Sequence, residues 1–151
     1  MPYLFDGNNL MGSWGKAKGG GDRRPEVIRR VARFCRLRGA RATVVFDGRP
    51  SRADVSEQHL GAISIRFPPA GQDADSVIRS LVEEARHPGD LIVVTSDKPL
   101  YSYVRGLGAQ ILRAHEWNAM ERRVSAGAES SAGEKPDRED DVEGWLKRFG
   151  G

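Results

Sequence analysis

Short apolar runs, rich in β-branched and aromatic residues, recur along the chain, and an aspartate closely follows three of them. The runs are residues 3–5, 42–46 and 91–94, and the acids are Asp6, Asp47 and Asp97. Runs of this kind are typical of buried strands, and an unbroken apolar run is typical of a parallel strand covered on both faces. The chain is therefore expected to build a sheet whose central strands end in acids.

Between these runs, apolar residues recur at helical spacing. The spacing predicts helices over about residues 25–38, 73–86, 99–107 and 115–124. Further strands are predicted at 62–67 and 109–112, a mobile glycine-rich loop at 11–22, and a loop or short irregular helix at 49–61. Strands that alternate with helices predict an α/β fold, in which three layers (α/β/α) surround a central, mostly parallel, doubly wound sheet.

Composition divides the chain into three parts. Residues 1–124 have the length and apolar content of one domain, and 125–139 are poor in large apolar residues and are predicted to be a flexible linker. Residues 140–151 carry Val142, Trp145, Leu146 and Phe149 at helical spacing, which predicts a short amphipathic helix. Whether this helix docks on its own domain or on a partner stays open.

Several functional classes are disfavoured by composition. The longest apolar runs are far shorter than the ~20 residues that span a bilayer, so a cytoplasmic protein without a membrane partner is expected. The single cysteine, Cys35, has no internal disulfide partner and falls among apolar helix positions. It is expected to be a buried structural thiol.

Basic residues are concentrated in the first third of the chain. The sequence has 24 Lys and Arg against 21 Asp and Glu, a net charge of +3. Arg29, Arg30, Arg33 and Arg36 are predicted on the outer surface of one helix, either as a solvated face or as a surface for a polyanion such as RNA. The candidate RNA contacts are Arg29, Arg33, Arg49, Arg52, Lys16, Lys18 and Lys98.

The acids that follow the strands are expected to meet at one edge of the sheet. Asp73 and Asp75 open a predicted helix after another strand, and Asn9 follows Asp6 closely. Helix capping explains any single one of these residues, but five converging carboxylates repel one another unless a cation lies among them. Oxygen ligands without His or Cys suit Mg²⁺ or Mn²⁺ better than zinc. Such a site can activate water for the hydrolysis of a phosphodiester.

Four segments resemble a known family in their order and spacing. They are residues 5–10 (FDGNNL), 44–48 (VVFDG), 73–78 (DADSVI) and 94–97 (VTSD). Together they resemble NYN domains of the YacP-like branch, within the PIN-like and flap-nuclease-like nucleases, over residues 1 to about 124. The resemblance implies a PIN-like α/β/α fold and metal-dependent RNA endonuclease activity.

The resemblance also implies residue roles. Asp6, Asp75 and Asp97 match the core metal-binding acids, and Asn9 matches an amide that orients the first of them. Asp73 is a further candidate ligand, and Asp47 matches an acid that often follows the second strand. Asn8 departs from the family pattern, which usually has an aromatic residue there. Some YacP-like proteins are associated with ribosomes and messenger RNA cleavage, so such RNA is an implied substrate, and the oligomeric state stays open.

Two other functions compete with the nuclease. The first is an RNA-binding or scaffold protein on the same fold, with weak catalysis. The second is a phosphatase or a DNA flap nuclease, but Asp6-Gly7-Asn8 lacks the second acid of the haloacid dehalogenase pattern, and the chain has little room for a helical arch. The nuclease is therefore the preferred hypothesis.

Overall fold

The computed structural model describes residues 2–15, 22–48 and 57–130 of the chain. Strands and helices are interspersed along these residues, with a 3-10 turn (η1) between α3 and β5. The elements are β1 (Pro2–Asp6), α1 (Gly7–Gly12), α2 (Arg24–Arg38), β2 (Arg41–Val45), β3 (Glu57–Leu60), β4 (Ile63–Arg66), α3 (Ala74–Glu84), η1 (Pro88–Asp90), β5 (Ile92–Val94), α4 (Lys98–Gly106), β6 (Gln110–Leu112) and α5 (Ala114–Ser130).

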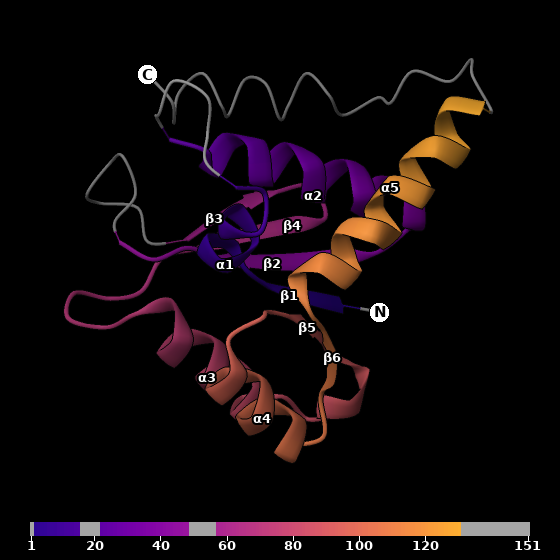
Figure 1. The fold of residues 1–151 in the computed structure, drawn as a ribbon. Helices are drawn as coiled ribbons and strands as arrows, with labels where there is room; N and C mark the ends of the chain where they lie inside the picture. Colours follow the sequence, from indigo (N-terminus) through magenta and orange to yellow (C-terminus); the bar gives the residue numbers. More distant parts are fainter. Residues whose placement is uncertain (1, 16–21, 49–56, 131–151) are drawn as a thin grey trace.

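The strands form one sheet in the order β3-β4-β2-β1-β5-β6. β1 is central and pairs in parallel with β2 on one side and with β5 on the other. β4 and β6 extend the parallel sheet, and β3 adds an antiparallel edge. Helices α2 and α5 cover one face and α3 and α4 the other (Figure 1). The predicted three-layer α/β/α fold is confirmed.

Alternate residues of β1 supply the two cores. Tyr3 and Phe5 point toward α2 and α5, whereas Leu4 points toward α3 and α4. On the first face, the fully buried Trp117 of α5 packs edge-on against Phe5, with ring centres 5.1 Å apart, and against Phe34 of α2 at 5.4 Å. A buried ring of this kind contributes about 1.5–3 kcal/mol, so α5 is firmly attached to the sheet.

Three elements differ from the sequence predictions. Residues 57–60 form strand β3 rather than loop, residues 7–12 form a short helix, and the last helix continues to Ser130 instead of ending near Val124. The polar β3 pairs only with β4 at the sheet edge, so it shows none of the apolar pattern of a buried strand. Residues 125–130 include alanines and a glutamate, which have a high helix propensity, and the segment has no large apolar residue that would have indicated packing. The predicted start of the linker at residue 125 is therefore wrong, and the rest of the predicted linker and the predicted 140–151 helix lie outside the described residues.

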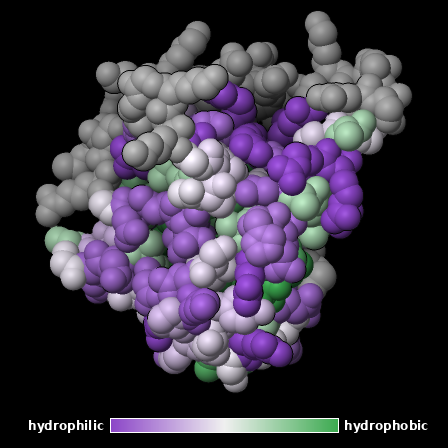
Figure 2. Space-filling model, in the orientation of Figure 1, coloured by the Kyte–Doolittle hydropathy of each residue, from purple (hydrophilic) through white to green (hydrophobic). Residues whose placement is uncertain are grey.

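Helix boundaries followed local sequence rules well. Pro25 lies in the first turn of α2, and Gly39 ends that helix with φ 62°, a left-handed conformation that glycine adopts without strain. Asp73 caps α3 and Asp97 caps α4 through their side chains. Among the helices described, none has the length and hydropathy needed to cross a membrane. The surface in Figure 2 is mostly hydrophilic, with hydrophobic residues in small separate areas.

Candidate active site

Asp6 is the last residue of the central strand β1, at the edge where all the parallel strands end. Its side chain is buried, with 9% of the residue exposed. Burial raises the pKa of Asp6 to about 6, the carboxylates of Asp47 and Asp97 also raise it, and hydrogen bonds from Asn9 and Thr95 act in the opposite direction. The parallel sheet thus brings three of the predicted site acids into one electrostatic neighbourhood.

Thr95 joins two of these acids. Its hydroxyl donates a hydrogen bond to Asp6 Oδ2 at 3.2 Å and accepts one from the backbone N–H of Asp97 at 3.1 Å. Asp97 in turn caps α4 by accepting from the N–H of Leu100 at 3.0 Å. Sequence reasoning missed Thr95, although its place in the Thr95-Ser96-Asp97 motif directly after a strand is a usable signal.

The side-chain amides of Asn8 and Asn9 bind the backbone just after β2 and β5, the strands on either side of β1. Asn8 Oδ1 accepts from the N–H of Asp47 at 2.7 Å, and Asn9 Oδ1 accepts from the N–H of Ser96 at 2.7 Å. The backbone N–H of Asn9 also contacts Asp6 Oδ1 at 3.4 Å. Asn9 therefore touches Asp6 through its backbone, while its side chain fixes the end of β5. Asn8, the departure from the family pattern, does the same for the end of β2.

Gly7 allows this close arrangement. A Cβ atom at this position would lie 2.6 Å from two ring carbons of Phe46 and 3.1 Å from the carbonyl oxygen of Val45. The backbone of Gly7 has no positive φ, so the glycine is needed for space rather than for an unusual conformation. The first turn of α1 can approach β2 only without a side chain here.

Asp73 and Asp75 make their contacts within α3. Asp73 Oδ1 accepts from the N–H and hydroxyl of Ser76, and these bonds hold the pKa of Asp73 below its ordinary value. Asp75 Oδ1 pairs with Arg79 Nε at 2.6 Å. Asp6, Asp47 and Asp97 lie where the parallel strands end, and we call this end of the sheet the acidic edge. Asp47 connects α3 to it, because its Oδ1 accepts a hydrogen bond from the N–H of Ala74 at 2.7 Å.

The predicted RNA contacts are spread over several parts of the molecule. Lys98 is exposed beside Asp97, and on α2 Arg29 is exposed and Arg33 half-buried. Lys16, Lys18, Arg49 and Arg52 lie outside the described residues.

The predicted four-arginine surface of α2 is partly wrong. Arg30 is bound by Glu121 of α5, and its guanidinium carbon lies 4.0 Å from the Trp14 ring centre, so this half-buried side chain joins elements and is only partly exposed to solvent. Arg36 is half-buried, and its Nε is buried. The position of Arg30 could not be predicted, because helical periodicity cannot reveal a partner 91 residues away.

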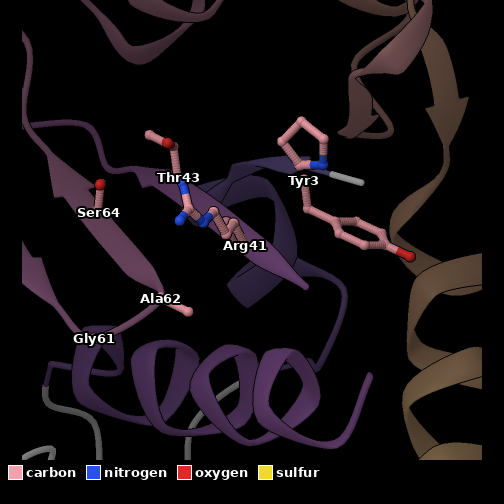
Figure 3. Close-up of a pocket in the computed structure, with 8 residues that line it drawn as sticks. Tyr3, Arg41, Thr43, Gly61, Ala62 and Ser64 are labelled. Carbon is pink, nitrogen blue, oxygen red and sulfur yellow. The ribbon is translucent and has the colours of Figure 1, made fainter. Parts of the chain in front are cut away.

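Among the described residues, hollows lie at both ends of the parallel strands. One adjoins the acidic edge and is lined by Asn8, Met11, Asp22, Arg23, Arg24 and Asp47. The other opens where β1, β2 and β4 begin, and Tyr3, Arg41, Thr43, Gly61, Ala62 and Ser64 line it (Figure 3). Its described lining residues include no carboxylate, so the first hollow is the one connected with the acids.

The acids at this edge offer oxygen atoms, the donors that hard divalent cations prefer. The Asp47 and Asp97 carboxylates disfavour the ionised form of buried Asp6, and a neighbouring positive charge would favour it. Within residues 2–15, 22–48 and 57–130, no three His, Cys, Asp or Glu side chains already form a group that could hold a metal ion. Mg²⁺ commonly takes one or two carboxylates and completes its shell with water and phosphate oxygens, which is compatible with this arrangement.

Comparison with known proteins gives a family and a fold. The family model of the YacP-like NYN domain matches residues 3–148. A crystal structure of a mutant of Rae1 (YacP) from Bacillus subtilis is 22% identical, with a TM-score of 0.70, and covers 99% of this chain and 93% of that one. A second structure of Bacillus subtilis Rae1 (YacP) is 21% identical, with a TM-score of 0.72, and covers 98% and 83%. No curated protein matches the chain. At these identities the structures show a shared fold.

Proposed function

The chain belongs to the YacP-like NYN domain family, and from this we propose that it is a Mg²⁺- or Mn²⁺-dependent endoribonuclease. The observation that supports the proposal most is the meeting of Asp6, Asp47 and Asp97 at the acidic edge. A buried carboxylate beside two others is costly in a purely structural role, but it suits a site that receives a cation.

Asp6 and Asp97 are the proposed primary ligands, with Asp75 and Asp73 added as the family resemblance implies. A bound ion would supply an activated water and neutralise charge on the phosphate oxygens. Thr95 and the backbone of Asn9 orient the Asp6 carboxylate, and the Asn8 side chain holds the backbone of Asp47. Arg79 competes for Asp75, so Asp75 can serve as a ligand only with the Oδ1 contact weakened or with its other oxygen.

The proposed substrate is RNA, and messenger RNA or ribosome-associated RNA in the cytoplasm is the class that the family resemblance implies. Water attack on phosphorus needs no side-chain nucleophile. The buried thiol of Cys35 fits this scheme, because burial raises its pKa to about 12 and keeps it protonated.

The test is cleavage of purified cellular RNA with mapping of the cut sites. We expect cleavage with Mg²⁺ or Mn²⁺ and none with EDTA. Asp6→Asn and Asp97→Asn should each lower the rate by about a hundredfold or more, since each removes a charged ligand. Asp90→Asn is the matched control, because Asp90 is exposed in η1 at the opposite edge and should leave the rate unchanged.

Two outcomes would contradict the proposal. Absence of both cleavage and divalent-metal binding would exclude a metal-dependent nuclease. Salt-dependent RNA binding without cleavage, unaltered by Asp97→Asn, would instead identify an RNA-binding protein on the same fold.

A further inference from the structure

The surface beside the ends of β5 and β6 combines an aromatic ring with two cations. Lys98 and Tyr101 are three residues apart on α4 and are therefore neighbours on its surface. The guanidinium carbon of Arg113, in the segment between β6 and α5, lies 5.3 Å from the Tyr101 ring centre. Lys98 and Arg113 are exposed, and Tyr101 is half-buried. We call these three residues the β6 flank.

Direct contacts connect the β6 flank to the candidate active site. Ser96 donates its backbone N–H to Asn9, and its hydroxyl accepts from the N–H of Ala114, the residue after Arg113. The N–H of Tyr101 donates to the carbonyl of Asp97 at 2.8 Å. The β6 flank is thus held by the same short segment, residues 95–97, that follows β5 and carries Asp97.

The charges of the β6 flank are available to a ligand. In the part of the chain that the structure describes, no ion pair joins Lys98 or Arg113 to a carboxylate. The nearby acid Glu116 is engaged with the backbone N–H of Arg113 at 2.9 Å. On the other side of the acidic edge, by contrast, Arg23 pairs with Glu26 and Arg24 with Asp22. An anion that approaches the acidic edge therefore finds less competition at the β6 flank.

An aromatic ring backed by a guanidinium is suited to an unpaired base. Bases stack on aromatic rings and on guanidinium planes alike, whereas a point charge such as an ammonium attracts phosphate. We propose that the β6 flank binds single-stranded RNA beside the acidic edge, with one base stacked on Tyr101 and Arg113 and the adjoining phosphate held by Lys98. This inference rests on the proposed function and names the part of the RNA that the site requires.

Binding of a short unstructured RNA, measured in EDTA at several salt concentrations, tests the proposal. Tyr101→Leu and Arg113→Ala should each weaken binding about tenfold, the effect of losing one stacked base. Lys98→Ala should lower the slope of log affinity against log salt by about 0.7, and Tyr101→Leu should leave that slope unchanged. Cleavage with Mg²⁺ should show a raised KM and an unchanged kcat in Tyr101→Leu.

Matched controls separate stacking from general charge and from folding. Arg105→Ala removes an exposed cation in the last turn of α4 and should bind RNA as the wild type does. Tyr101→Phe keeps the ring and should also match the wild type. A blunt RNA duplex offers no unpaired base, so Tyr101→Leu should not change its binding. Arg113 is exposed, so Arg113→Ala still tests the proposal if Tyr101→Leu does not fold.

The possible failures are distinguishable. Wild-type affinity in both Tyr101→Leu and Arg113→Ala, with RNA cleavage intact, would overturn the stacking site and leave the proposed function standing. A wild type that neither binds nor cleaves RNA would overturn both.

Discussion

At the scale of single residues, Asp6 determines how stability depends on pH. Its pKa is raised from 3.8 to about 6, so between these values the folded protein holds a proton that the unfolded chain has released. The free energy of unfolding of the metal-free protein should therefore fall as pH rises from about 4 to about 6, by up to about 3 kcal/mol. Asp6→Asn removes this penalty and should stabilise the metal-free protein at about pH 7.5 but much less at about pH 4.5.

Urea unfolding of both proteins in EDTA at the two pH values measures the difference. Saturating Mn²⁺ should largely cancel the difference at the higher pH, because an ion at one hundred times its Kd adds about 2.7 kcal/mol to the free energy of unfolding of a protein that binds it. An equal effect of Asp6→Asn at both pH values would show that burial does not disfavour the Asp6 carboxylate.

At the scale of elements, the junction of β1 with α1 depends on close contact between Gly7 and Phe46. Gly7→Ala should destabilise the protein by about 1–3 kcal/mol, because the new methyl group meets the Phe46 ring. Combining it with Phe46→Leu should cost less than the sum of the two changes. Gly12→Ala is the control, since no atom lies within 4 Å of its added Cβ. Chemical unfolding measures all four variants, and strict additivity would contradict the contact.

The same elements show what sequence patterns can and cannot predict. The acidic edge was predictable because Asp6 ends one parallel strand and Asp47 and Asp97 closely follow two others, so that strand direction brings these residues together. Helix α1 was missed, since its two glycines and two asparagines are poor helix formers that are held here by the Asp6 cap and by bonds from Asn8 and Asn9. Side-chain partners from different elements, such as Arg30 and Glu121, could not be predicted, because periodicity describes one element at a time.

At the scale of the whole molecule, α5 closes the fold by binding α2. Arg30 Nε donates to Glu121 Oε2 at 2.9 Å, and 30% of the Arg30 side chain is exposed against 9% for Glu121. Glu121→Ala should lower the free energy of unfolding by on the order of 1–3 kcal/mol, because it removes the short hydrogen bonds to a half-buried guanidinium and leaves the longer, 3.9 Å contact with Glu26. A double-mutant cycle with Arg30→Ala, measured by chemical unfolding, should give a coupling of about 0.5–2 kcal/mol. Arg122→Ala, on the exposed side of α5, is the control and should have little effect on the free energy of unfolding. A coupling of zero would contradict a stabilising interaction between Arg30 and Glu121.

The central position of β1 also governs when the site can exist during synthesis. Asp6 is made before its partners, because its strand pairs with β5 through Tyr3 and Ile92, and its hydroxyl partner Thr95 follows 89 residues later. At about 5–20 residues per second, this separation takes seconds to emerge. A nascent chain therefore carries Asp6 for seconds before Thr95 can bind it, so the candidate site assembles only after β5 has been made.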